Sequence, residues 1–293
     1  MREVGVLRWV RRTAMRQFQK RVLRTDSRMR LPTGGTIILP RRSRSGSEAF
    51  VSDANMDWGS EALFSRFADR NADAFDVGSH IGYYAAYLAP LVRHVYAFEP
   101  DQRNLPALRV NAALSSKITV VEKAVSDRSG TVCFAETAQS ERSGVSQDGR
   151  EVPAITVDDF AAETGARPTL IKIDVEGHDL AVVRGAKRVM AEMQPLILAE
   201  FNLNETSAND VDALFGLCQE RQYSVWSLVW GDRQPLIARH RTELVRVDRT
   251  LLETVRTKML LLVPQRLEAK FAELERRRVE SGGRSGGVPA PLI

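Results

Sequence analysis

From Ala74 onward, short apolar runs alternate with segments whose apolar residues recur every three or four positions. The runs are typical of buried strands, and the recurring pattern is typical of helices that cover a sheet. This alternation predicts an α/β protein with a doubly wound, mostly parallel, Rossmann-like sheet. We expect strands at Ala74–Val77, His94–Phe98, Ile118–Lys123, Thr169–Ile173, Leu196–Glu200, Tyr223–Val229 and Lys258–Val263. We expect helices at Tyr83–Leu91, Leu105–Ala113, Val157–Ala162, Leu180–Ala191 and Asp210–Gln219, with Arg246–Thr257 as a candidate connecting helix.

The first 30 residues follow another pattern, that of a basic amphipathic helix. Its apolar residues recur at spacings of three and four, interrupted by two arginines: Val4, Leu7, Val10, Ala14, Phe18 and Val22. Residues 1–50 hold 13 Lys and Arg against 3 Asp and Glu, whereas residues 51–264 hold 23 against 30. Residues 1–24 are therefore a candidate for peripheral contact with an anionic membrane surface. A helix packed on the body with solvated arginines, and a mitochondrial presequence, are alternatives.

Composition and turn residues divide the chain into four parts. Residues 1–30 form the basic helix, and residues 31–72 a preamble with a turn at Pro32–Gly35, a strand at Thr36–Leu39, a polar loop at Arg41–Gly46 and a helix at Gly59–Arg70. Residues 73–264 form the main domain. Residues 265–293 begin as a charged helix and end in a tail rich in Gly, Ser and Pro, for which we expect disorder.

Cysteine content and hydropathy indicate the compartment. Cys133 and Cys218 form neither a metal-ligand spacing nor a disulfide framework, so a reducing, cytoplasmic environment is expected. The longest apolar runs, such as Met259–Val263, are far shorter than the roughly 20 residues that cross a bilayer. We therefore expect no membrane span, and peripheral membrane association remains the alternative to a purely cytoplasmic location.

The loop after the first predicted strand indicates a nucleotide-type ligand. Glycines at 78 and 82 allow a sharp turn and a close approach to the N-terminus of the next helix. Glu99 ends the second strand, where an acidic side chain holds a ribose diol. The dinucleotide fingerprint G-x-G-x-x-G is absent, and Asp76 suits a cationic amino group better than a phosphate. S-adenosylmethionine, with an ammonium, a ribose and no phosphate, fits this pattern.

Acidic residues also crowd the ends of the fourth and fifth strands. Asp174, Glu176, His178 and Asp179 follow one strand, and Glu200 ends the next, two residues before Asn202. Part of the cluster is explained by a helix start, which favours acidic side chains. Asp174, Glu200 and Asn202 could instead ligate a hard cation, or accept hydrogen bonds from substrate hydroxyls. Of these alternatives, a divalent metal is the one that we do not expect.

These motifs resemble the FkbM family of S-adenosylmethionine-dependent methyltransferases. The resemblance rests on DVGSHIGYY, VYAFEP, KAVSDRSG, LIKIDVEGHD and LAEFN, and extends over about residues 31–264. It implies a class I methyltransferase fold, with seven strands and an antiparallel strand near one edge. It also implies methyl transfer to hydroxyls of sugars, glycolipids, polyketides and similar metabolites.

Through the resemblance, site residues are assigned in this sequence. The cofactor-binding set is Asp76, Gly78, Ser79, His80, Gly82, Glu99, Pro100, Asp101, Asn104, Ala124, Val125, Ser126 and Asp174. Asp174 is also the first candidate for a catalytic base and His178 the second, and Glu176 is the third residue of the predicted catalytic set. The chain has Ser79-His80 where the family usually has Ala-Asn, and His178-Asp179 where Ala-Glu is common.

Rival functions are distinguished by specific features. An RNA methyltransferase would use the basic arm on phosphates, but the arm has few aromatic residues and the body is acidic, so no nucleic-acid partner is expected. A non-catalytic protein would bind the cofactor without turnover and dock through its arm. An NAD-dependent oxidoreductase is disfavoured by the glycine spacing. Because the tetrapeptide N/D-P-P-Y/F of amino-methylating enzymes is absent, O-methylation is preferred.

Overall fold

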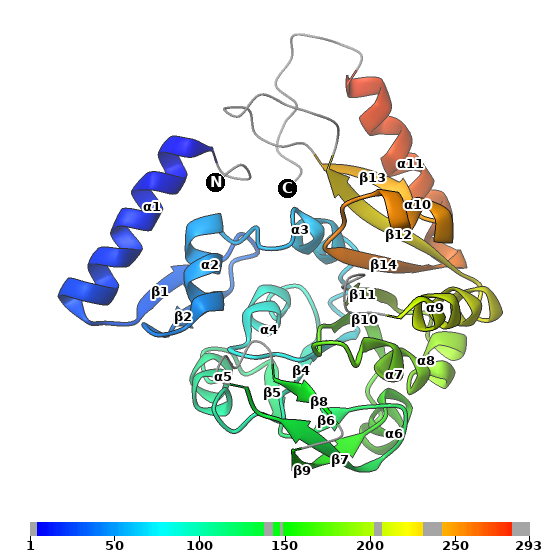
Figure 1. The fold of residues 1–293 in the computed structure, drawn as a ribbon, viewed down its shortest axis with the longest axis horizontal. Helices are drawn as coiled ribbons and strands as arrows, with labels where there is room; N and C mark the ends of the chain where they lie inside the picture. Colours follow the sequence, from blue (N-terminus) through cyan, green and yellow to red (C-terminus); the bar gives the residue numbers. More distant parts are fainter. Residues whose placement is uncertain (1–4, 138–142, 147–148, 202–206, 231–241, 283–293) are drawn as a thin grey trace.

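The computed structural model describes residues 5–137, 143–146, 149–201, 207–230 and 242–282. Within these ranges, an eight-stranded sheet forms the centre of the molecule (Figure 1), in the order β13-β12-β14-β11-β10-β3-β4-β5. Its strands are β3 (Asp73–Val77), β4 (His94–Phe98), β5 (Ile118–Val121), β10 (Pro168–Ile173), β11 (Leu196–Glu200), β12 (Tyr223–Trp230), β13 (Thr242–Arg246) and β14 (Met259–Pro264).

Strand directions confirm the predicted class of fold. Strands β5, β4, β3, β10 and β11 are parallel neighbours, and β14 is antiparallel to both β11 and β12. All seven predicted strands are present, but the count of seven is wrong because β13 adds an eighth at the edge. The predicted helix at Arg246–Thr257 is wrong at its start, because Arg246 is the last residue of β13. Helix α10 occupies Arg249–Thr254, and the Asp248 carboxylate caps it by accepting from the Leu251 N–H at 2.7 Å.

Helices cover both faces of the sheet, as the doubly wound prediction requires. One apolar core joins the sheet to α3, α4, α5 and α11, and the other joins it to α6, α7, α8, α9 and α10. The bounds are α3 (Ser60–Ser65), α4 (Tyr83–Leu88), α5 (Leu105–Ala112), α6 (Val157–Thr164), α7 (Asp179–Arg184), α8 (Lys187–Glu192), α9 (Ala208–Glu220) and α11 (Gln265–Gly282).

The predicted helix at Leu180–Ala191 is two helices, α7 and α8, interrupted at Gly185 and Ala186. Gly185 packs so closely on the loop after β6 (Ala124–Val125) that a Cβ would lie 2.1 Å from the Ser126 carbonyl oxygen. An apolar period of three to four residues continues across the break, so periodicity alone did not reveal it. The contact sets the position of Ser126 relative to α7.

The N-terminal part is a helix followed by a hairpin, and two predictions there need correction. Helix α1 (Val6–Phe18) continues as a π-helical turn, η1 (Gln19–Leu23), and residues 27–30, predicted as helix, form β1 (Ser27–Arg30). Strand β1 pairs antiparallel with β2 (Thr36–Leu39). The predicted loop at Arg41–Gly46 instead starts helix α2 (Arg44–Ser52), because the Ser43 hydroxyl accepts from the Gly46 N–H at 2.9 Å and caps it.

Helix α1 packs on α2 through arginines rather than through its apolar stripe. Arg16 is 1% exposed and donates to the Ser27 hydroxyl at 2.5 Å and to the Pro40 carbonyl at 2.8 Å. Arg12 pairs with Asp53 at 2.9 Å. The opposite face of α1 and η1 presents its large apolar residues to solvent: Leu7, Val10, Met15, Phe18, Val22 and Leu23. This packing agrees with a helix seated on the body, yet it leaves the predicted stripe uncovered.

A second, four-stranded sheet, which was not predicted from the sequence, is formed by strands that follow β5 in the chain. Its order is β6-β9-β7-β8, formed by β6, β7 (Gly130–Ala135), β8 (Gly144–Val145) and β9 (Arg150–Ile155). Parts of residues 135–152 and 203–209, and most of residues 231–242, lie outside the described residues. Within the described ranges, no helix is both long enough and apolar enough to span a bilayer.

Candidate active site

A cleft opens at the carboxyl ends of the parallel strands, where ligands bind in open α/β sheets. It is lined by most of the residues predicted to bind the cofactor: Asp76, Gly78, Ser79, His80, Glu99, Pro100, Asn104, Ala124, Val125 and Asp174. Glu176 also lines it, together with Phe98 and Phe134. The site therefore combines polar side chains with apolar surfaces beside β4 and β6.

The loop between β3 and α4 depends on Gly78. Its φ is +75°, and a Cβ there would lie 1.8 Å from the carbonyl oxygen of Asp174. The N–H groups of Gly78 and Ser79 both donate to the Phe98 carbonyl, at 3.1 and 2.9 Å. The loop is therefore held between β10 and β4, at a spacing that leaves no room for a side chain.

Asp76 is buried beneath this loop. Its Oδ2 accepts from the Ala85 N–H at 2.9 Å, and its Oδ1 lies 3.7 Å from the Lys172 ammonium nitrogen. Burial raises the pKa of Asp76, and the positive charge of Lys172 opposes this shift. The side chain connects β3 to α4 and to β10, so it holds the loop in place as well as lining the cleft.

Glu99 lies at the end of β4, as predicted. Its Oε2 accepts from the His80 N–H and its Oε1 from the Asp101 N–H, each at 2.8 Å. The side chain is 5% exposed, and burial raises its pKa to about 7, against the effect of these two hydrogen bonds. Two backbone donors thus orient the carboxylate toward the cleft and leave lone pairs for a ligand.

A buried lysine connects the cofactor loop to the acidic cluster. Lys172, 3% exposed near the carboxyl end of β10, donates to the Gly78 carbonyl at 2.9 Å and lies 3.3 Å from Asp174 Oδ2. Burial opposes ionisation of Asp174, but Lys172 and a hydrogen bond from Glu200 outweigh it and hold the pKa of Asp174 below its usual value. Asp174 is therefore ionised at neutral pH.

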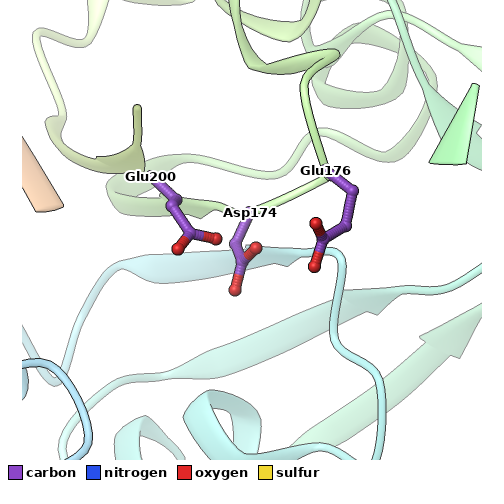
Figure 2. Close-up of side chains that lie close together, drawn as sticks. All are labelled: Asp174, Glu176 and Glu200. Atoms are coloured by element: carbon purple, nitrogen blue, oxygen red, sulfur yellow. The ribbon is translucent and has the colours of Figure 1, made fainter. Parts of the chain in front are cut away.

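Three carboxylates lie close together in the cleft (Figure 2), and one of them, Asp174, contacts this lysine. Asp174, Glu176 and Glu200 each offer an oxygen within 4.8 Å of the others. Burial, followed by the charge of Asp174, raises the pKa of Glu200 far above its usual value. Glu200 thus keeps a proton and donates it in a hydrogen bond to Asp174. The predicted cation set included Asn202, which lies outside the described residues.

Four predicted site residues do not line the cleft. Gly82 begins α4, and Asp101 is fully buried and paired with Arg103 at 2.6 Å. His178 lines a neighbouring hollow, where its Nε2 lies 2.8 Å from the Ser126 hydroxyl. Burial lowers the pKa of His178. The structure therefore separates His178 and Ser126 from the cleft that contains Asp174.

Asp179 agrees with the alternative explanation of the acidic cluster, in which acidic side chains stabilise the start of a helix. Its carboxylate accepts from the N–H groups of Val175 and Gly177, at 3.3 and 3.2 Å. Burial, reinforced by the charge of Asp174, raises its pKa to about 7. Asp179 therefore supports the turn that brings Glu176, with a φ of +53°, to the mouth of the cleft.

Several residues of the cleft were not predicted from the sequence. Lys172 is part of the motif LIKIDVEGHD but was not assigned a role in the site, although a charge inside the apolar strand LIKI is itself a signal of a buried partner. Lys258, Glu48 and Asp57 come from segments far apart in the chain. No local pattern marks those three, because the fold alone brings the preamble beside β14.

The doubly wound sheet, its antiparallel strand β14 and the cleft at the strand ends agree with the class I methyltransferase fold expected from the motifs. The model of the methyltransferase FkbM domain family matches residues 76–225. The chain belongs to this family, which confirms the class of enzyme predicted from the motifs.

Relatives with described activities are distant. The hexuronic acid methyltransferase AglP of Haloferax volcanii is 27% identical over 136 residues, which cover 45% of this chain and 56% of that protein. The solved structure of the methyltransferase FkbM from Methylobacillus flagellatus KT is 18% identical, with a TM-score of 0.41, over 69% of this chain and 52% of that one. An O-methyltransferase from Thermotoga maritima is 14% identical, with a TM-score of 0.39, over 70% and 64%.

Proposed function

We propose that the protein transfers a methyl group from S-adenosylmethionine to a hydroxyl of a sugar, glycolipid or related metabolite. The observation that carries this proposal is the position of Asp174, whose Oδ2 lies 3.3 Å from the Lys172 ammonium beside the cofactor loop and whose side chain is about one third exposed in the cleft. A carboxylate in that position can accept a proton from an acceptor hydroxyl. The name of the relative AglP supports a sugar acceptor.

The residues of the cleft fit the cofactor. Glu99, oriented by two backbone N–H groups, suits a ribose diol, and Asn104 beside it is 6% exposed. Val125 and Phe134 offer apolar surface for an adenine ring. The buried Oδ1 of Asp76 has no hydrogen-bond donor among the described residues, which suits a nearby cationic group.

The chemistry assigns one role to each group around the acceptor. S-adenosylmethionine supplies a methyl group on a positively charged sulfur, which keeps the bonding electron pair when the methyl is transferred. Asp174 accepts the proton of the acceptor hydroxyl, and Lys172 keeps Asp174 ionised beforehand. Protonated Glu200 orients the Asp174 carboxylate through their hydrogen bond.

Replacement of the base tests this assignment. We expect Asp174→Asn to lower kcat about 100-fold or more, since general-base catalysis contributes roughly 10²–10⁴-fold. S-adenosylmethionine binding should weaken less than kcat falls, by about tenfold at most, about 1.4 kcal/mol, because Asp174 reaches the cofactor loop only through Lys172. The measurement is production of S-adenosylhomocysteine with a sugar acceptor, alongside calorimetric titration of the cofactor. Cofactor binding without any turnover by the wild type would favour the non-catalytic alternative.

We also propose that the exposed face of α1 lies on an anionic membrane. Leu7 is 88% exposed and Phe18 53%, and the exposed side chains of Arg11 and Arg21 supply the complementary charge. Helix α1 packs on α2, which contributes Ser45 and Glu48 to the cleft. Membrane contact through α1 would therefore bring the cleft close to a lipid-linked acceptor.

Vesicle binding tests the membrane proposal. The double variant Leu7→Asp, Phe18→Asp should weaken binding to phosphatidylserine-containing vesicles at least tenfold, because each side chain loses about 1.5–3 kcal/mol of burial. The matched control is Val110→Asp, Leu114→Asp, which alters two exposed apolar residues at α5. Equal binding by wild type and the α1 variant, or dimerisation through this face instead, would contradict the proposal.

A further inference from the structure

The cleft continues past Asp174, away from the cofactor residues. In the sheet, β3 and β4 lie on one side of β10, and β11 and β14 lie on the other. Glu99 ends β4, whereas Lys258 directly precedes β14, which runs antiparallel and so begins at the same edge. Lys258 and Glu99 thus lie on opposite sides of Asp174, and both line the cleft.

The wall around Lys258 is built from the preamble and is firmly anchored. The Lys258 ammonium lies 2.9 Å from Asp57 Oδ1 and donates to the Met56 carbonyl at 2.8 Å. The Tyr84 hydroxyl donates to Asp57 Oδ2 at 2.6 Å. The Asp57 N–H donates at 2.9 Å to Glu61, which is 1% exposed. Lys258 is therefore fixed in orientation, although it lines an open cleft.

Backbone conformation in the same wall is unusual. Asp53, Ala54 and Trp58 all have positive φ angles, of 60°, 59° and 58°. Residues other than glycine seldom adopt this conformation, and it costs about 1–3 kcal/mol each where the surroundings impose it. The loop between α2 and α3 is thus held in a strained shape around Asp57. Such strain is concentrated at ligand-binding sites.

Glu48 and Lys258 are spaced to receive a hydroxyl group. Glu48 Oε1 lies 3.7 Å from the Lys258 nitrogen, which is too long for a hydrogen bond between them. The Glu48 side chain is 52% exposed and that of Lys258 28%. A hydroxyl between the two could accept from the ammonium and donate to the carboxylate, so both groups would be satisfied at once.

Charge in this part of the cleft selects against anions. The carboxyl groups of Glu48, Asp57 and Asp174 line the same cleft as Glu176, and Lys172 and Lys258 are already paired with carboxylates. A carboxylate or phosphate placed beside Glu48 would be repelled, and the remaining lysine of the cleft, Lys123, follows β5 on the side of the cofactor residues. An uncharged polyhydroxylated ring would form hydrogen bonds with the donors and acceptors of the cleft and would not be repelled.

We propose that Glu48 and Lys258 form the acceptor subsite, and that it binds an uncharged sugar ring through a hydroxyl next to the one that is methylated. This inference rests on the proposed methyltransferase function. It assigns a substrate-binding role to α2 and the preamble, outside residues 76–225 that match the family model. It also predicts a preference opposite to the uronic acid in the name of AglP.

Paired acceptors that differ only in charge test the subsite. The probes are the methyl glycosides of glucose, galactose and mannose and of the corresponding uronic acids, with S-adenosylhomocysteine production as the readout. We expect turnover of at least one uncharged glycoside, with kcat/KM about tenfold or more above its uronate, since a charged hydrogen-bonding contact is worth about that factor.

The variant Glu48→Gln should raise KM for the uncharged glycoside about tenfold, with kcat within twofold of wild type. It should also reduce the ratio of kcat/KM for the uncharged glycoside to kcat/KM for the uronate. Glu192→Gln, on the exposed surface of α8, is the matched control. The thermal midpoint of each variant should equal that of wild type, because both side chains are exposed.

Two results would overturn the subsite: preference for the uronates, or unchanged KM in Glu48→Gln. A protein that binds S-adenosylmethionine but turns over none of the uncharged glycosides would also contradict it. Failure to bind S-adenosylmethionine would instead contradict the proposed function, so the two failures are distinguishable.

Discussion

At the scale of single residues, the site depends on a few side chains whose charges are set by burial. Lys172 has almost no exposed surface, yet it contacts Asp76, Asp174 and the Gly78 carbonyl together. Removing one partner of such a buried set leaves an uncompensated charge, which is costly. The sequence identified Asp174 and Glu99, because strand-end acids form a recognisable pattern. It did not identify the lysine that determines the ionisation of Asp174.

Gly78 allows a sharp prediction at this scale. Gly78→Ala would place a Cβ 1.8 Å from the Asp174 carbonyl oxygen, so the loop must move and S-adenosylmethionine affinity should fall at least tenfold, about 1.4 kcal/mol. Gly165→Ala is the matched control, since Gly165 also has a positive φ, +67°, but no atom within 4 Å of the added Cβ. The measurement is cofactor titration of both folded variants. Wild-type affinity in Gly78→Ala would show that the loop does not contact the ligand.

At the scale of elements, apolar periodicity predicted the strands and the central helices well. Strands such as His94–Phe98 and Leu196–Glu200 match their predicted bounds because both faces are buried and the apolar run ends with the strand. Errors occurred where a tertiary contact or a cap decides the structure. Gly185 interrupts a continuous apolar period because it packs on Ser126, and Ser43 starts a helix in a segment that reads as a loop.

Helix α1 shows a further limit of patterns. The stripe was identified correctly, but a stripe alone does not say which face packs on the protein. The structure buries Arg12 and Arg16 against the hairpin and α2, where carbonyl and hydroxyl oxygens accept from Arg16. Buried arginines of this kind are rare and need such partners. Sequence composition suggested only solvated arginines.

At the scale of the whole molecule, basic and acidic residues are concentrated in different regions. The arm carries the excess of basic residues, whereas the charged residues that line the cleft are seven acidic and three basic ones. A cleft of this kind suits a positively charged cofactor and an uncharged acceptor, and it disfavours nucleic acid. Topology explains why the acceptor wall was not predicted: residues 44–57 and Lys258 are about 200 positions apart, and only the sheet order brings them together.

The most direct test of the account is calorimetric titration of S-adenosylmethionine into the full chain and into Glu99→Gln, each at pH 6 and pH 8. Because burial raises the pKa of Glu99 to about 7, the carboxylate that holds the ribose is mostly protonated at pH 6 and ionised at pH 8. We predict micromolar affinity at pH 8 that is roughly tenfold weaker at pH 6. Glu99→Gln should bind weakly and equally at both values. Absence of binding by the folded wild type, or identical affinity in the two proteins, would contradict the assignment of this cleft to the cofactor.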